Sequence, residues 1–477
     1  MTILAIDQGT TGTKAHLLRA DGAFETLKGF EHKQIYPQPE WVEHDPEELI
    51  AHLQAALALA GDATAIGIAN QGETVIAWDA RTKRPIHNAI VWQDARTSAM
   101  TERLKAEGKE ELTLGLAGLP LDPYFSASKL RWLLDNVPEA QALRREGRLR
   151  FGTSDAYFLD RLAGTFATDV TTASRTSLMN LETLHWDQRL ADLFGVPIDC
   201  LPEIRPTTGA FGAIGKAQVT ASLVDQQAAL FGHGCRRRGD AKITFGTGAF
   251  ALAVAGDTVP RDAKSGLEST IAWKLGDAPC AYALQGGIYN AASAVNWARS
   301  LGLFADYAEI DAFAAESAIS RGLAFVPALS GLSCPYWDRR AAGLWLGMGL
   351  DTTKADMMQA LLEGVALLAE TVLATIDALS PLGAVVSVDG GLSRNGYFTR
   401  FLAEATSKRI RVPASAELTG LGAAQLAMLG AGKASLAESW AGEKDGAPRT
   451  EIVPQAPLPR TLHARFAEAV ERSKAWR

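Results

Sequence analysis

A chain of 477 residues with a net charge of −7 exceeds the size of one compact core and lacks the basic face typical of nucleic-acid-binding proteins. Its 47% hydrophobic and 21% charged residues are typical of a soluble globular protein with two or three domains. The four cysteines are scattered without a C-x-x-C pair, and no signal peptide opens the chain, so we expect free thiols in a cytoplasmic protein.

Residues 2–19 predict a β-hairpin with a polar tip. An apolar run ends at Asp7, a turn of glycines and threonines follows, and apolar residues resume at Ala15. Backbone N–H groups, threonine hydroxyls and Lys14 at such a tip can bind a polyphosphate, while Asp7 can hold a hydrated Mg²⁺. An ordinary hairpin with a polar turn is the alternative, which this segment alone does not exclude.

The rest of the first half alternates strands and helices. Residues 46–60 predict a helix, because Asp45 is a good N-cap and Pro46 suits the first helical position. The other elements expected here are a strand over 65–70 and helices over 129–136 and 226–231.

The second half repeats the order of strand, Gly/Thr turn and strand. A strand over 241–244 leads into the turn 245–248 and a second apolar strand. A buried strand over 384–388 then ends at Asp389-Gly390-Gly391, before a helix over 396–406, and this directs backbone N–H groups toward a ligand. We therefore expect two similar α/β domains that close on a nucleotide.

The basic turn 236–238 is the expected domain boundary. It separates an N-terminal domain of residues 1–236 from a C-terminal domain of residues 237–477. Neither contains G-x-x-x-x-G-K-[ST] or a G-x-G-x-x-G after a strand, which argues against a P-loop enzyme and a dinucleotide dehydrogenase. Acidic residues interrupt the apolar stretch 361–379, so we expect no membrane span.

Longer segments match known signatures. Tyr124–Asn136, and Gly343–Met348 continued by Asp356–Glu363, are similar to the two signatures of the FGGY carbohydrate kinases. Further matches lie at residues 36–46, 88–94, 119–124 and 225–232. The chain is identified as a member of this family by resemblance, and within it resembles the glycerol kinases. The resemblance implies an α/β fold of two actin/Hsp70-like (ribonuclease H-like) ATPase domains with a cleft between them.

The resemblance also implies a function and a set of residue roles. It implies an ATP- and Mg²⁺-dependent kinase that phosphorylates a terminal hydroxyl of a small polyol, with glycerol the leading candidate and glycerol 3-phosphate the product. Asp225 matches the general base, and Asp7 matches the Mg²⁺ site, with water between. The residues matched to the substrate site are Glu73, Trp92, Tyr124, Asp225, Gln226 and Phe250. Those matched to the ATP site are Thr10, Thr11, Lys14, Gly246, Thr247, Asn296, Gly391 and Asn395. The family further implies a homodimer or homotetramer, with no nucleic-acid or membrane partner.

Simpler roles compete with these assignments. Asp225 also suits the N-cap of the helix over 226–231, and a single Trp92 or Tyr124 is more often packed in a core. The alternative from another functional class is an actin-like ATPase that acts as a chaperone, filament or sensor. It predicts ATP turnover that is independent of any polyol.

Gly72 departs from the glycerol kinase pattern. Glycerol kinases have an arginine at this position, which clamps the glycerol hydroxyls together with the following Glu, here Glu73. Loss of a charged hydrogen bond costs about 1.5–3 kcal/mol, and glycine leaves volume beside Glu73. The alternative substrate is therefore a longer polyol or ketose of the erythritol, ribitol or xylulose type. A further alternative is that another basic side chain fills the gap from elsewhere in the chain.

Overall fold

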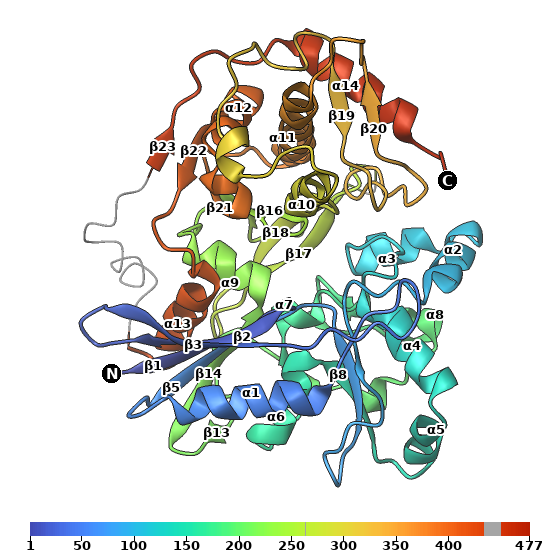
Figure 1. The fold of residues 1–477 in the computed structure, drawn as a ribbon. Coiled ribbons are helices and arrows are strands. Elements are labelled where there is room, and N and C mark those ends of the chain that lie inside the picture. The colour runs from blue at the N-terminus through green and yellow to red at the C-terminus, as the bar shows by residue number, and fades with distance from the viewer. Residues whose placement is uncertain (263, 434–449) are drawn as a thin grey trace.

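The computed structural model describes residues 1–262, 264–433 and 450–477. Two large mixed β-sheets, one in each half of the chain, form the centres of the lower and upper parts of the molecule in Figure 1. The helices of the described residues are α1 (Pro46–Ala58), α2 (Ser98–Ala106), α3 (Glu110–Leu116), α4 (Ser126–Asn136), α5 (Pro138–Arg145), α6 (Ser154–Leu162), α7 (Val170–Ala173), α8 (Gln188–Phe194), α9 (Asp225–Gly232), α10 (Ala292–Ser300), α11 (Lys354–Leu379), α12 (Gly396–Thr406), α13 (Leu418–Gly430) and α14 (Arg460–Ser473).

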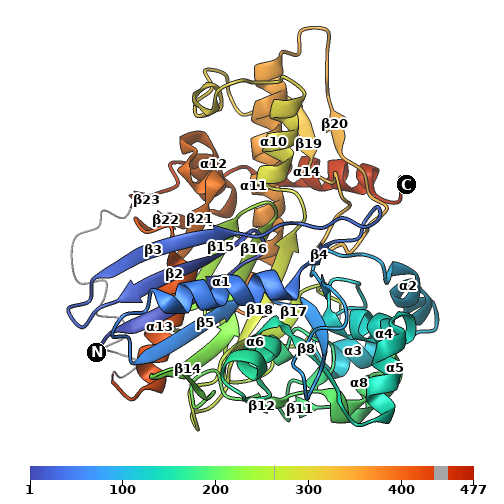
Figure 2. The same ribbon diagram turned by 60° about the horizontal axis from the view of Figure 1, so that its bottom comes forward.

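The first large sheet belongs to the N-terminal half. Its strands lie in the order β13 (Ala213–Ile214), β14 (Ala217–Val224), β5 (Ala65–Asn70), β1 (Ile3–Gln8), β2 (Gly12–Leu18) and β3 (Phe24–Glu31). β1 and β2 form an antiparallel hairpin, as predicted, while β5 runs parallel to both β1 and β14. Side chains alternate along β1, so that Leu4 and Ile6 face α1 while Ile3 and Ala5 face α13. Figure 2 shows α1 lying across this sheet.

The second large sheet belongs to the C-terminal half. Its strands lie in the order β17 (Glu268–Trp273), β18 (Ala281–Ile288), β16 (Ala249–Gly256), β15 (Ala241–Phe245), β21 (Val385–Gly390), β22 (Arg409–Val412) and β23 (Thr450–Ile452). β15 and β16 again form an antiparallel hairpin, and β21 runs parallel to β15. The order of hairpin and parallel strand therefore occurs in both halves.

Smaller sheets complete the fold. A four-stranded sheet has the order β4 (Glu43–His44), β7 (Ala89–Ile90), β6 (Val75–Asp79) and β8 (Leu149–Thr153). Two-stranded sheets pair β10 (Met179–Asn180) with β11 (His185–Trp186), β9 (Ala167–Asp169) with β12 (Glu203–Arg205), and β19 (Ala324–Val326) with β20 (Leu344–Leu346).

The two halves meet at a close helix crossing. α13, which lies between β22 and β23 of the second sheet in the chain, packs against α9 and against the first sheet. A Cβ atom at Gly422 would lie 1.9 Å from the carbonyl oxygen of Ala228, and one at Gly232 would lie 1.9 Å from that of Leu418. Only glycine allows this approach. Because α13 packs on the first sheet, the division into residues 1–236 and 237–477 stays a prediction.

The long helix α11 is the core helix of the C-terminal half. It is long and apolar enough to cross a membrane, but 78% of its most apolar window is buried inside the protein. It packs against α12 and β19. Its apolar character is therefore explained by the protein core.

Candidate active site

The carboxyl ends of three parallel strands bring the predicted catalytic segments together. Gln8 at the end of β1 is level with Asn70 of β5, which in turn is level with Val224 of β14. The chain continues from these ends into the turn with Thr10, into Glu73, and into Asp225. Ligand sites of α/β sheets lie at this edge.

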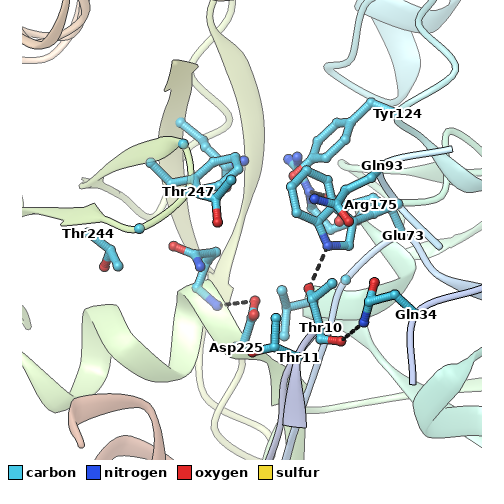
Figure 3. A pocket seen from close by; sticks show the side chains of 18 of the residues that line it. Thr10, Thr11, Gln34, Glu73, Gln93, Tyr124, Arg175, Asp225, Thr244 and Thr247 are labelled. Atoms are coloured by element: carbon cyan, nitrogen blue, oxygen red, sulfur yellow. Dashed lines mark hydrogen bonds and ion pairs between the residues drawn. The ribbon is translucent and has the colours of Figure 1, made fainter. Parts of the chain in front are cut away.

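A cavity of about 420 Å³ lies at this edge, between the two halves of the chain. The predicted residues that line it are Thr10, Thr11, Glu73, Trp92, Tyr124, Asp225, Gln226, Gly246, Thr247 and Phe250. Figure 3 shows Thr247 of the second hairpin on the opposite side of the cavity from Tyr124 and Glu73, with Asp225 near Thr11 below them. The structure thus brings the predicted polyol residues and both Gly/Thr hairpins to one place.

Three aromatic rings form an apolar wall of this cavity. The Trp92 ring meets the Tyr124 and Phe250 rings edge-on, at centroid distances of 5.6 and 6.0 Å. Its Nε1 donates a hydrogen bond to Thr10 Oγ1 at 2.8 Å. The wall can cover the carbon skeleton of a small polyol, and the indole N–H links it to the first hairpin.

Asp225 is the first residue of α9, and the N-cap position belongs to Val224. Its Oδ1 accepts a hydrogen bond from the backbone N–H of Gln226 at 2.6 Å. Burial raises the pKa of Asp225 to about 7, and the negative charges of Asp7 and Glu73 act in the same direction. A carboxyl group with this pKa can accept a proton near neutral pH.

A basic side chain reaches Glu73 from another part of the chain. Arg175, which follows α7, donates from Nε to Glu73 Oε1 at 2.6 Å and from Nη2 to Glu268 Oε2. Its guanidinium carbon lies 5.7 Å from the centroid of the Tyr124 ring. Burial alone would lower the pKa of Arg175, but the carboxylates of Glu268 and Glu73 raise it above the usual value. Glu73 has a left-handed backbone with φ of 58°, a conformation found at functional sites.

The volume expected beside Gly72 is partly filled. A Cβ atom at position 72 would lie 3.1 Å from Cγ1 and 3.7 Å from Cγ2 of Val224. Position 72 therefore contacts the residue that precedes Asp225 in the Cβ direction, while Gly72 itself lines the 420 Å³ cavity together with Glu73.

Sequence reasoning missed two polar residues of the cavity region, Arg175 and Lys242. It noted Gln285 only as a departure from the family, which typically has an acidic residue at this position. Lys242 Nζ donates to Gln226 Oε1 at 2.6 Å, and burial lowers the pKa of this lysine to about 8. Gln285 Nε2 donates to Glu268 Oε2 at 3.0 Å. Each charged side chain had a signal in the sequence. Lys242 lies inside a strand that was expected to be buried, and Arg175 lies inside a run of small residues.

Lys14 and Asp7 do not line the 420 Å³ cavity. Lys14 Nζ donates to both carboxylate oxygens of Glu417 at 2.9 Å, and its side chain is half exposed. Asp7 is the register partner of Lys14 in the β1–β2 hairpin. Burial raises the pKa of Asp7 to about 7, although Lys14 opposes this shift.

The remaining predicted ATP residues line a second cavity of about 610 Å³ in the C-terminal half. These residues are Asn296, Gly391 and Asn395. Asn395 is the N-cap of α12, where its Oδ1 accepts from Phe398 N at 2.7 Å, and its Nδ2 donates to Ile310 O. The Tyr307 hydroxyl donates to Asn296 Oδ1 at 2.8 Å. Gly391 borders open space, which leaves room for a bound group.

Comparison with known proteins gives sequence matches along the chain. Residues 2–232 match the N-terminal domain of the FGGY family of carbohydrate kinases, and residues 241–431 match its C-terminal domain. The chain is 40% identical to a glycerol kinase of Symbiobacterium thermophilum, over 99% of this chain and 98% of that protein. It is 41% identical to a glycerol kinase of Geobacter sp. (strain M21), over 99% of both chains.

Solved structures give the same result. The Plasmodium falciparum glycerol kinase, solved with ADP, is 30% identical and superposes with a TM-score of 0.89, over 99% of this chain and 98% of that one. A ligand-bound xylulose kinase from Lactobacillus acidophilus is 22% identical with a TM-score of 0.86, over 99% and 96% of the two chains, which shows the fold alone. The predicted two-domain α/β architecture is confirmed. The chain belongs to the FGGY family of carbohydrate kinases.

Proposed function

We propose that this protein is an ATP-dependent kinase that phosphorylates a terminal hydroxyl of glycerol to give glycerol 3-phosphate. One observation carries the proposal: a single cavity of about 420 Å³ holds the carboxyl group of Asp225, the hydroxyl-binding pair Glu73 and Tyr124, and two facing Gly/Thr hairpins. The relatives named glycerol kinase, at about 40% identity over nearly the whole chain, support glycerol as the substrate.

The reaction needs little covalent chemistry from the protein. The oxygen of the terminal hydroxyl attacks the γ-phosphorus, and the bond from that phosphorus to the β–γ bridging oxygen breaks, so that ADP leaves. The hydroxyl proton passes to the carboxylate of Asp225. The aromatic wall around Trp92 reduces the room for water, which is the competing acceptor.

Asp7 and Asp225 fit the requirements of a Mg²⁺ site. Mg²⁺ is usually held by one or two carboxylates together with water and phosphate oxygens. Burial raises the pKa values of both carboxyl groups, the charge of Asp7 adds to the rise at Asp225, and a cation would favour the ionised form of each. The described residues contain no group of three or more His, Cys, Asp or Glu side chains that could hold a metal alone, which suits a site completed by the nucleotide. When bound, Mg²⁺ neutralises charge on the phosphates.

A panel of acceptors tests the proposal. Glycerol, erythritol, ribitol and xylulose are compared in a coupled ADP assay, and glycerol is expected to give the highest kcat/KM. Glycerol as the poorest acceptor would overturn the substrate. ADP formation that does not depend on any polyol would instead support an actin-like ATPase.

Two further properties stay predictions from the family resemblance. A homodimer or homotetramer is expected, and sedimentation velocity of the purified protein measures it. A cytoplasmic location is also expected, and fractionation of the source cells tests it.

A further inference from the structure

Arg175 lines the substrate cavity, and one of its nitrogens has no partner among the described residues. The residue is 1% exposed and lines the cavity. Nε and Nη2 are held by Glu73 and Glu268, whereas Nη1 is buried and has no hydrogen-bond partner within residues 1–262, 264–433 and 450–477. Two of the three nitrogens thus fix the side chain, and the third is left for another group.

A buried donor of this kind is unusual in a folded protein. Leaving a buried polar group unpaired costs about 1–3 kcal/mol, and more when the group is charged. Most such groups therefore have a partner, which is water or a ligand where the protein supplies none. Because Arg175 borders the cavity, a molecule bound in the cavity can be that partner.

The local charge indicates what kind of group this is. Arg175 stands between two carboxylates, Glu73 and Glu268, so the three side chains together carry a net negative charge. A phosphate or carboxylate would be repelled, whereas the oxygen of a neutral hydroxyl can accept from Nη1. Glu73 Oε2 accepts no hydrogen bond from the described residues, and it can take the hydroxyl proton of the same substrate.

We propose that Nη1 of Arg175 donates a hydrogen bond to a non-reacting hydroxyl of the polyol, so that Arg175 together with Glu73 binds the end of the substrate that is not phosphorylated. This inference rests on the proposed polyol kinase activity. It gives Arg175 the role of a substrate-binding, specificity-determining residue, and it explains why Gly72 needs no cationic side chain.

The test compares substrates that differ by one hydroxyl. Glycerol is compared with 1,2-propanediol, which lacks one terminal hydroxyl, and with 1,3-propanediol, which lacks the central one. The wild type is expected to prefer glycerol over the analogue that lacks the contacted hydroxyl by roughly ten- to a hundredfold in kcat/KM. In Arg175→Lys this preference is expected to fall at least tenfold, mainly through the KM for glycerol, while the KM for ATP is unchanged.

A matched control separates contact from structural damage. Arg339 also joins the two halves through a carboxylate, because its Nε and Nη2 donate to Asp122, but it does not line the 420 Å³ cavity. Arg339→Lys is expected to keep the wild-type preference. A merely structural role of Arg175 predicts that Arg175→Lys slows glycerol and both analogues by the same factor, and this result would overturn the inference.

A second variant covers the case in which Arg175→Lys does not fold. Arg175→Gln/Glu268→Gln removes the cation together with one of its buried carboxylate partners, and it is measured with the same three substrates. An unchanged preference in this variant also overturns the inference. If the wild type prefers another polyol in the acceptor panel, the proposed substrate is wrong, and the same comparison with that polyol and its deoxy analogues decides the role of Arg175.

Discussion

The contact between position 72 and Val224 gives a prediction that can be worked out from distances. A Cβ atom at position 72 would lie 3.1 Å from Val224 Cγ1, whereas carbon atoms pack best at about 3.5–4.0 Å. Val224 has little freedom to move, because it is buried and its backbone N–H donates to Thr171 Oγ1 at 3.0 Å. Gly72→Ala is therefore expected to push the residue that directly precedes Asp225.

The size of the effect follows from the packing. Overpacking lowers the free energy of unfolding by about 1–3 kcal/mol. Because the contact at position 72 is too short by only a few tenths of an ångström, we expect a cost in the lower half of this range. Val224→Ala alone is expected to cost about 1–2 kcal/mol, because it removes buried methyl groups and leaves a gap. In Gly72→Ala/Val224→Ala the new Cβ enters that gap. The loss in the free energy of unfolding should therefore be about 1–2 kcal/mol smaller in the double variant than the sum of the losses in the two single variants.

The cycle is measured by kcat/KM for glycerol and by the urea midpoint of all four proteins. For Gly72→Ala the urea midpoint is expected to fall by the equivalent of about 1–2 kcal/mol in the free energy of unfolding, and kcat/KM for glycerol is expected to fall with it, with partial recovery of both in the double variant. If the stability losses of Gly72→Ala and Val224→Ala add within about 0.5 kcal/mol, or if Gly72→Ala keeps the wild-type kcat/KM, the predicted contact between position 72 and Val224 is refuted. The same contact makes Gly72→Arg alone a poor test of substrate identity, since a low activity would then reflect crowding at Val224.

Asp225→Asn is expected to lower kcat by roughly a hundred- to ten-thousandfold while ATP still binds, as measured by calorimetry, and near-normal turnover would contradict the role of the base. Burial raises the pKa of Asp225 to about 7, and only the ionised form accepts a proton. The kcat/KM for glycerol should therefore rise with pH and then level, with a midpoint at or below about 7 because bound Mg²⁺ favours the ionised form. A kcat/KM that does not change from pH 5 to pH 8 would exclude the role of Asp225 ionisation. Glu417→Gln frees Lys14 for the phosphates and is expected to lower the KM for ATP roughly twofold, whereas an increase would show that the Lys14–Glu417 pair itself supports the site. Removal of Mg²⁺ with EDTA should abolish turnover until Mg²⁺ is restored, and turnover that persists would exclude the role of the metal.

Elements with local signals could be predicted from the sequence. The helix expected over 396–406 coincides with α12, and the one expected from 46 begins there and ends at Ala58, because caps and turns are encoded in neighbouring residues. α4 begins at Ser126, ahead of the predicted residue 129, because its first turn consists of small residues without apolar periodicity. Glu73 and Asp225 lie at the same edge of the first large sheet, because each follows the carboxyl end of a strand and these strands are parallel.

The ion pairs of the site could not be predicted in this way. Arg175 lies 102 residues from Glu73 and 93 from Glu268 in the chain, and no local pattern specifies such partners. Lys14 was assigned to the phosphates from its place in the hairpin, whereas in the structure it pairs with Glu417, 403 residues away. Which charges meet depends on how the two halves pack, and this depends in turn on contacts such as the α9–α13 crossing.

Gly72 and Arg175 are best understood as one arrangement. A cation beside Glu73 does not have to come from the preceding residue, since the guanidinium of Arg175 already lies 2.6 Å from its carboxylate. Because the cation comes from there, Glu73 does not depend on a long side chain at position 72 for its charge partner. Val224 can then pack against the glycine and hold the start of α9. The departure at position 72 therefore leaves Glu73 with a cationic partner, and the acceptor panel decides between glycerol and a longer polyol.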